Sequence, residues 1–154
     1  MTIELKHAVP DFAAASTGGD FKLSSARGKI VVLYFYPKDN TPGCTTEGQE
    51  FAALQPQFAR AGAIVLGVSR DSLKSHQNFK DKMAFPFELL SDADEAVCAL
   101  FGVIKQKLMY GKQVRGIERS TFVIDGKGKL AAEWRGVKVA GHAAQVLATV
   151  QSLG

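Results

Sequence analysis

The chain has 154 residues, of which 46% are hydrophobic and 22% charged, and its formal net charge is +4. This composition is typical of a globular chain, and we expect one domain over residues 1–154. The basic residues are scattered and no run approaches 18 apolar residues, which argues against a nucleic-acid-binding patch and a membrane-spanning helix. Because the N-terminus also lacks an apolar signal segment, we expect a cytoplasmic protein without nucleic-acid or membrane partners.

The cysteines and histidines give no sign of a metal or cofactor site. The only two cysteines, Cys44 and Cys98, form neither a CxxC motif nor a disulfide framework. The three histidines are isolated and lack the spacing of metal ligands: His7, His76 and His142. We therefore expect neither a metal nor a cofactor.

The first 28 residues are rich in turn formers. A Ser-Thr-Gly-Gly-Asp run at 16–20 separates Phe12 from later apolar residues, which predicts a small hairpin laid over the main body. Residues 30–36 (IVVLYFY) then form a near-continuous apolar run that stops at Pro37. Such a run is typical of a strand buried on both faces of an α/β sheet.

A helix and a second strand follow this run. Three apolar residues at helical spacing predict a core-facing stripe: Phe51, Leu54 and Phe58. Pro56 lies within this stretch and predicts a kink, and Gly62 ends the helix. Residues 63–69 (AIVLGVS) predict another buried strand, so the order indicates a right-handed βαβ unit.

The second half of the chain contains further helices and a hairpin. A helix is predicted after Asp71 or Ser72, followed by a short strand at 88–90. Asp92 with Glu95 three residues later predicts another helix start through a capping box.

Residues 102–118 are mixed, contain glycines and show no clear period, so the pattern predicts no element there. The turn sequence at 125–128 (DGKG) lies between the apolar runs 120–124 and 130–134, which predicts a hairpin. A last helix is predicted at about 141–153, from the spacing of its apolar residues.

This order of elements predicts an α/β protein with a thioredoxin-like fold. Its mixed β-sheet would be flanked by helices on both faces, and the N-terminal hairpin would lie on the main body. The turn after residues 30–36 would then lie at the carboxyl end of a central strand. Ligands bind outside that edge of parallel sheets, so we expect the functional site there.

Cys44 lies just after the strand predicted at 30–36, where the following helix begins. Thr41 can be the N-cap and Pro42 can occupy the first helical position. The thiol would then lie in the first helical turn, where unpaired N–H groups and the positive end of the helix dipole stabilise an anion. A thiol at such a place ionises more readily than a free one. We therefore interpret Cys44 as a reactive cysteine.

These residues also carry a family resemblance. Pro37, Thr41 and Cys44 match the peroxiredoxin motif PxxxTxxC, and TPGCTTE at 41–47 resembles the bacterioferritin comigratory protein (Q-type) subfamily. The resemblance continues through three further segments: 85–103, 109–112 and 116–125. It implies an antioxidant oxidoreductase, a thiol-dependent peroxidase that reduces hydrogen peroxide and organic hydroperoxides.

The resemblance implies a role for each matching residue. Cys44 would be the peroxidatic cysteine, oxidised by peroxide to a sulfenic acid. Thr41 would hydrogen-bond the peroxide, and Pro37 would shield one side of the pocket. Arg119 would stabilise the thiolate and the leaving oxygen, since a guanidinium is always charged and offers several donors. Glu47 would orient this arginine.

The chain departs from the family at the resolving cysteine. Many members carry it five residues after the peroxidatic cysteine or in the next helix, where this chain has Gln49 and Lys80. This implies a one-cysteine enzyme recycled by an external thiol such as glutathione, glutaredoxin or thioredoxin. Cys98 is then either a packing residue or an unusual resolving cysteine, which would need Cα atoms within about 7 Å.

Two other functions deserve comparison, and the residues argue against the first. A disulfide oxidoreductase on the same fold needs a second thiol about three residues from the first, and residues 43–47 offer none. A non-catalytic binding module, or a peroxide-sensing relay to a partner protein, is compatible with the residues. We expect a monomer, because no additional exposed strand or helical arm is evident.

Overall fold

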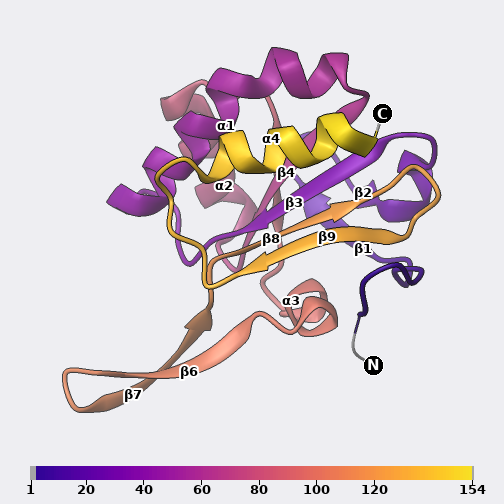
Figure 1. The fold of residues 1–154 in the computed structure, drawn as a ribbon. Coiled ribbons are helices and arrows are strands. Elements are labelled where there is room, and N and C mark those ends of the chain that lie inside the picture. The colour runs from indigo at the N-terminus through magenta and orange to yellow at the C-terminus, as the bar shows by residue number, and fades with distance from the viewer. Residues whose placement is uncertain (1–2, 154) are drawn as a thin grey trace.

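The structure is a computed structural model that describes residues 3–153, apart from the side chain of Met109. At its centre lies a seven-stranded mixed sheet with the order β2-β1-β5-β4-β3-β8-β9 (Figure 1). Its strands are β1 (Ala13–Ser16), β2 (Phe21–Lys22), β3 (Ile30–Phe35), β4 (Ala63–Ser69), β5 (Glu88–Ser91), β8 (Ser120–Ile124) and β9 (Leu130–Arg135). The helices are η1 (Leu23–Ala26, a 3₁₀ turn), α1 (Pro42–Arg60), α2 (Leu73–Met83), α3 (Ala96–Phe101) and α4 (His142–Leu153).

Strand β3 is the central strand. It pairs in parallel with β4 and antiparallel with β8, and all six of its residues are buried. This confirms the strand predicted from the apolar run at 30–36, although it ends one residue earlier, at Phe35. The predicted βαβ unit is confirmed as β3-α1-β4.

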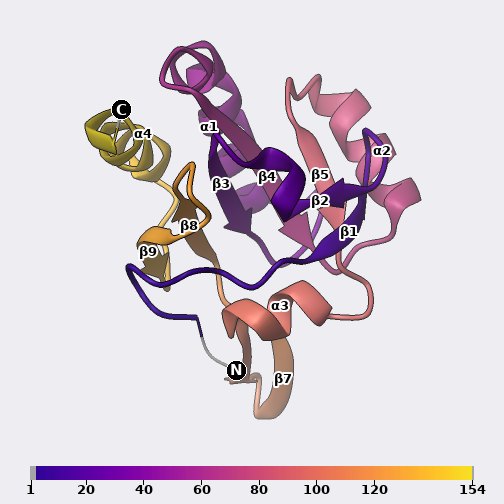
Figure 2. The same ribbon diagram turned by 90° about the vertical axis from the view of Figure 1, so that its right-hand side faces the viewer.

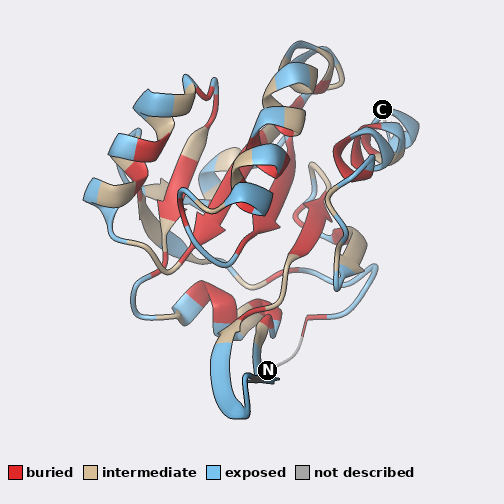
Figure 3. Cartoon of the chain, turned by 90° about the vertical axis from the view of Figure 1, so that its left-hand side faces the viewer, coloured by how far each residue is buried: buried red, intermediate tan, exposed pale blue. Residues whose placement is uncertain are grey.

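The sheet separates two hydrophobic cores. On one face Val32 and Tyr34 pack with α1, α2 and α4, and on the other face Val31 and Leu33 pack with α3 and the N-terminal segment. Figure 2 shows these layers along the strands, and Figure 3 shows the buried strands between partly exposed helices. Alternate side chains of a strand point to opposite faces, which is why one apolar run supplies both cores.

Local chain signals set the helix ends. Pro42 occupies the first turn of α1 as expected, and Ser72 caps α2 by accepting the N–H of Ser75 at 3.1 Å. Pro56 lies on the exposed side of α1, which continues past it to Arg60. An exposed proline there removes a donor without displacing a core residue.

Of the capping box predicted at α3, the role of Asp92 is confirmed and that of Glu95 is wrong. Asp92 does cap the helix, because its carboxylate accepts the backbone N–H groups of Val97 at 3.0 Å and Cys98 at 2.7 Å. Glu95, however, has a left-handed backbone (φ 65°) just before the helix, and its side chain does not reach back. It pairs instead with two arginines, Arg70 and Arg115.

The sequence pattern predicts no element at 102–118, but the structure has two strands there. Strands β6 (Ile104–Met109) and β7 (Lys112–Ile117) pair antiparallel as a separate two-stranded sheet. This hairpin, here called the arm, projects away from the body in Figure 1. It has no hydrophobic period because most of its residues are exposed on both faces, so sequence patterning could not show it. The premise for expecting a monomer, that no exposed arm exists, is therefore wrong.

Both predicted hairpins are present. β1 and β2 form the N-terminal hairpin, and β8 and β9 form the hairpin around residues 125–128. The N-terminal hairpin does not lie over the body as expected, because β1 pairs with β5 and extends the edge of the central sheet. Helices flank both faces of a mixed sheet, which is the thioredoxin-like arrangement. Within residues 3–153, no helix combines the length and hydrophobicity needed to cross a membrane.

Candidate active site

Cys44 lies in the first turn of α1, at the carboxyl end of β3. Thr41 occupies the N-cap with an extended backbone, and its carbonyl accepts the N–H of Thr45 at 2.9 Å. The N–H groups of Gly43 and Cys44 have no acceptor four residues back within the helix, so the dipole and these donors favour an anion there. The side chain is recessed, since only 2% of Cys44 is exposed.

Arg119 links Cys44 to Glu47. It lies in the connection between β7 and β8, and its Nη2 donates to the Sγ atom of Cys44 at 3.5 Å. Its Nη1 donates to Oε1 of Glu47 at 2.5 Å. Gly43 permits this approach, because a Cβ atom at that position would lie 3.2 Å from Nη2. The structure thus brings together three residues that the sequence singled out.

The three groups form a buried electrostatic unit. Burial raises the pKa of Glu47 to about 7, against the opposing attraction of the Arg119 guanidinium. Burial alone would lower the pKa of Arg119, but the negative charges of Glu47 and Cys44 outweigh it and raise that pKa. Oε2 of Glu47 is buried without a hydrogen-bond partner. Arg119 therefore remains a cation between two groups that can each carry a negative charge.

Thr41 and Pro37 border the approach to the sulfur. The hydroxyl of Thr41 donates to the carbonyl of Lys38 at 2.8 Å. A carbonyl only accepts, so the hydroxyl proton is engaged and the free lone pair of Oγ1 can accept a hydrogen bond. Pro37 is exposed and lines a hollow of about 270 Å³ together with Arg119 and Ile117. A small molecule can reach Arg119 through this hollow.

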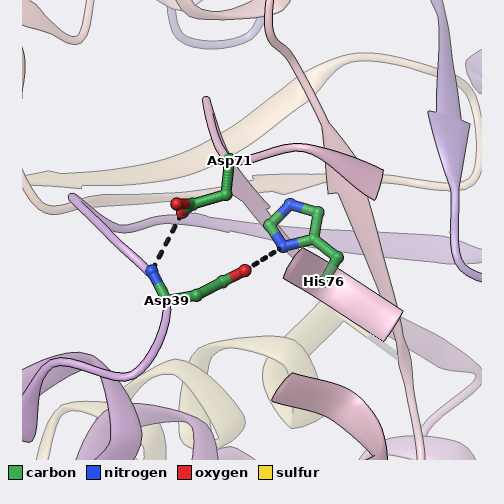
Figure 4. Close-up of side chains that lie close together, drawn as sticks. All are labelled: Asp39, Asp71 and His76. Atoms are coloured by element: carbon green, nitrogen blue, oxygen red, sulfur yellow. Dashed lines mark hydrogen bonds and ion pairs between the residues drawn. The ribbon is translucent and has the colours of Figure 1, made fainter. Parts of the chain in front are cut away.

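A buried polar network lies behind the active-site turn (Figure 4). The carboxylate of Asp39 contacts Nδ1 of His76 at 2.8 Å and accepts the hydroxyl of Tyr36 at 2.6 Å. The backbone N–H of Asp39 donates to Asp71 at 2.9 Å. These contacts tie the turn between β3 and α1 to α2 and to the end of β4.

Both ring nitrogens of His76 have partners. Its Nε2 lies 2.8 Å from the carbonyl of Leu90, which only accepts, and its Nδ1 faces the Asp39 carboxylate. Burial would raise the pKa of Asp39, but the hydrogen bonds from His76 and Tyr36 lower it overall. Asp39 and His76 thus form a buried polar pair.

Ligand atoms of Asp39, Asp71 and His76 lie within 4.8 Å of one another. All three side chains are engaged in hydrogen bonds to protein groups, so we interpret the cluster as structural. Sequence spacing could not find it, because Asp39 follows a strand and His76 lies far along the chain in α2. Only the fold brings these positions together.

His142 is a second buried histidine beside the site that the sequence did not suggest. Its Nε2 lies 2.8 Å from the hydroxyl of Thr121 on β8. Burial, together with the positive charge of Arg119, lowers the pKa of His142 to about 4. It is therefore neutral at pH 7 and adds no second positive charge near Arg119.

Cys98 is separated from this site. It lies in α3 and belongs to the core on the opposite face of the sheet from Cys44. Burial, a hydrogen bond to Asp92 and the negative charge of that residue raise the pKa of the Cys98 thiol well above its usual range. It is a protonated packing residue in this structure.

The chain is similar to known proteins over most of its length. The AhpC/TSA family matches residues 5–133. The chain is 56% identical over 151 residues to peroxiredoxin Bcp of Xanthomonas campestris pv. campestris, covering 97% of this chain and 94% of the relative. Among solved structures it resembles Xylella fastidiosa PrxQ (TM-score 0.92, 46% identity, 97% and 96% of the two chains). It also resembles the Xanthomonas campestris bacterioferritin comigratory protein, studied for alkyl peroxide reduction (TM-score 0.90, 55% identity, 97% and 96%).

The contacts of Asp39 predict a pH-dependent stability. Asp39→Asn removes a buried carboxylate that accepts from Tyr36 and Ser75 and faces His76, and it should lower the free energy of unfolding at pH 7 by about 1–3 kcal/mol. Because the pKa of Asp39 is lower in the folded chain than its ordinary value of 3.8, the wild type should keep this contribution at pH 7 and lose it as the pH falls below about 4. Urea unfolding measures both effects, with the exposed Asp20→Asn as the control. Equal stability of Asp39→Asn and wild type at pH 7 would contradict the prediction.

Glu47 predicts the opposite pH dependence in a higher range. Its pKa is about 7 in the folded chain against its ordinary value of 4.5, so the folded state retains a proton that the unfolded state has lost. The free energy of unfolding should fall as the pH rises through this range. Glu47→Gln lacks this loss, so urea unfolding should show its stability relative to wild type rising from about pH 5 to about pH 8. Glu133→Gln on β9 is the partly exposed control, and a parallel trend in both variants would refute the prediction.

Proposed function

Because the chain belongs to the AhpC/TSA family and is a peroxiredoxin of the bacterioferritin comigratory protein (Q-type) subfamily, we propose that Cys44 is its peroxidatic cysteine. The sequence resemblance to this subfamily is confirmed, as is the enzyme class. The observation that carries the proposal is the contact between the Arg119 guanidinium and the Cys44 sulfur at the start of α1. It supports both an ionised sulfur and a developing negative charge beside it.

The proposed reaction begins with the Cys44 thiolate. It attacks the terminal oxygen of a peroxide ROOH, the O–O bond breaks, and the products are Cys44 sulfenic acid and RO⁻, which takes up a proton to leave as water or an alcohol. Two electrons pass from sulfur to the peroxide. Arg119 can donate to the departing oxygen through Nη2, the atom that contacts the Cys44 sulfur. The hydroxyl of Thr41 can accept the O–H of the peroxide. Glu47 holds the guanidinium in place.

We propose a one-cysteine cycle, in which an external thiol reduces the sulfenic acid. Three features support it. Gln49 and Lys80 occupy the two positions at which the family carries resolving cysteines. Cys98 lies across the sheet in the other core and is protonated, so a Cys44–Cys98 disulfide would require the sheet or both helices to open. The two-cysteine alternative that uses Cys98 is correspondingly disfavoured.

We further propose hydrogen peroxide and organic hydroperoxides as substrates, and thioredoxin, glutaredoxin or glutathione as reductants. Two cysteines that cannot pair with each other without opening the fold suit the reducing cytoplasm. A single domain over residues 1–154 is consistent with one sheet that takes strands from residue 13 to residue 135. A monomer remains our proposal, now on the ground that the basic arm would repel its own copy.

Mass spectrometry after one equivalent of peroxide tests the cycle. We expect sulfenic acid on Cys44, trapped by dimedone, and no internal disulfide. Cys98→Ala should keep peroxidase turnover with dithiothreitol within about twofold of wild type, and Cys44→Ser should abolish it. A Cys44–Cys98 disulfide with loss of turnover in Cys98→Ala would overturn the one-cysteine cycle. Turnover that survives Cys44→Ser would overturn the peroxidase assignment itself.

The role of Arg119 predicts a large effect of a conservative change. Lysine offers one ammonium group and cannot contact Cys44 and Glu47 through two separate nitrogens as the guanidinium does. Arg119→Lys should therefore slow the oxidation of Cys44 by peroxide about 10²–10³-fold, the usual effect of losing one such donor. Stopped-flow measurement of sulfenic acid formation reports the rate, with the exposed Arg60→Lys as the control. A rate within threefold of wild type in Arg119→Lys would exclude the role.

A further inference from the structure

The arm carries the net charge of the whole chain. Residues 104–117 contain three lysines, one arginine and no acidic residue, whereas the whole chain has 19 basic and 15 acidic residues. The rest of the chain is therefore balanced at 15 of each sign. A charge of +4 concentrated on one projecting hairpin creates a local positive field, although the basic residues look scattered along the sequence.

Strand pairing sorts these charges onto two faces. Lys107 pairs opposite Val114, Lys105 opposite Gly116, and Lys112 opposite Met109. Paired residues share a face and neighbours along a strand alternate, so Lys105, Lys107 and Lys112 share one face, here called the lysine face. The other face carries Leu108 and Arg115.

One lysine of this face lines the same hollow as Arg119, whose Nη2 contacts the Cys44 sulfur. Lys107 lines the hollow of about 270 Å³ that contains Pro37 and Arg119. It also lines a neighbouring hollow of about 380 Å³, which shares Pro37 and Ile117 with the first. Strand β7 ends at Ile117, two residues before Arg119, so the arm is attached directly to the active site.

The charges of the lysine face remain available to a partner. Arg115 on the opposite face is paired with Glu95, which also pairs with Arg70 and holds the base of the arm against the body. Among the described residues, no ion pair involves the three lysines of the arm. All three lysines are exposed.

We propose that the lysine face docks an acidic protein that delivers the reducing thiol to Cys44, an inference that rests on the proposed one-cysteine cycle. The first thiol of this partner attacks the sulfur of Cys44 sulfenic acid, which forms a mixed disulfide and releases water. The second thiol of the partner then breaks the mixed disulfide, returning the Cys44 thiol and leaving a disulfide in the partner. The partner thus supplies both electrons.

The chemistry of the arm favours an acidic protein over other occupants. An element that inserts into a membrane surface places its apolar side chains toward the lipid with lysines at the same boundary. Here the two most exposed apolar side chains of the arm lie away from the lysine face, with Leu108 (70% exposed) on the opposite face and Tyr110 (97% exposed) at the tip. Among the described side chains, the lysine face carries one exposed apolar residue, Val114 (43%). A second copy would bring another +4 arm against the first. An acidic protein surface needs no apolar side chains beside the lysines and is attracted by their charge.

A matched pair of charge-reversal variants tests the proposal. Lys105→Glu/Lys112→Glu alters the lysine face, and Lys127→Glu/Lys129→Glu alters the β8–β9 turn, at the opposite end of β8 from Arg119. Two such changes bring the net charge of +4 to zero in either variant. The probes are a reduced thioredoxin and a reduced glutaredoxin of negative net charge, with dithiothreitol as the small thiol. The measured quantity is the second-order rate constant for reduction of Cys44 sulfenic acid.

With at least one protein donor, we expect the arm variant to be slower than wild type by about tenfold or more at low salt, and the control to stay within about twofold. Added salt should bring the wild-type rate down toward that of the arm variant. Dithiothreitol, and the rate of peroxide oxidation, should not distinguish the three proteins.

Several results would overturn the proposal. One is that the arm variant and the wild type are reduced by the protein donors at equal rates. Another is that neither protein donor reduces the wild type faster than dithiothreitol does at equal thiol concentration. Two outcomes would assign the arm a different partner if the protein-donor rates of the arm variant stay unchanged. Loss of binding to phosphatidylglycerol vesicles in the arm variant alone would assign the arm to a membrane. Loss of a dimer in the arm variant alone would assign it to a second copy. If the wild type fails to consume peroxide even with dithiothreitol, the proposed function fails instead.

Discussion

The active site depends on one buried contact, in which a guanidinium is shared between a sulfur and a carboxylate. Arg119 is mostly buried, and a buried cation is tolerated only when negative groups compensate it. Glu47 provides this compensation through Nη1 of Arg119 and leaves Nη2 for Cys44. The carboxylate itself is poorly solvated, so its pKa rises to about 7. The charge of Arg119 is therefore only partly neutralised, which is what a thiolate and a leaving oxygen require.

This contact needs a rigid frame, because Cys44 and Arg119 come from distant parts of the chain. Strand β3 and its neighbour β8 place the start of α1 beside the connection that carries Arg119. The contact between Asp39 and His76 then fixes the turn between β3 and α1 from behind. The same central sheet places Cys98 in the opposite core. The sheet therefore assembles the reacting groups and also isolates the second cysteine from them.

The arm extends the site beyond the reaction with peroxide. Lys107 lines the same hollow as Arg119, and no ion pair among the described residues involves the three lysines of the arm. In the proposed one-cysteine cycle, a peroxide has only to reach the recessed sulfur, whereas return to the thiol needs a second molecule to reach the same sulfur. The distribution of charge suits a protein partner for that second half of the cycle.

The sequence by itself determined the sheet order of the central βαβ unit, the position of Cys44 and the family. These follow from local signals, namely an apolar run, a proline at a helix start and a contiguous motif. It could not reveal the Asp39–His76 pair, because two polar residues in different elements carry no joint pattern until the fold places them 2.8 Å apart. It also missed the arm, since a hairpin exposed on both faces has no hydrophobic period. Burial is a property of the folded chain, and so only the tertiary structure decided the charge state of Glu47 and the separation of the two cysteines.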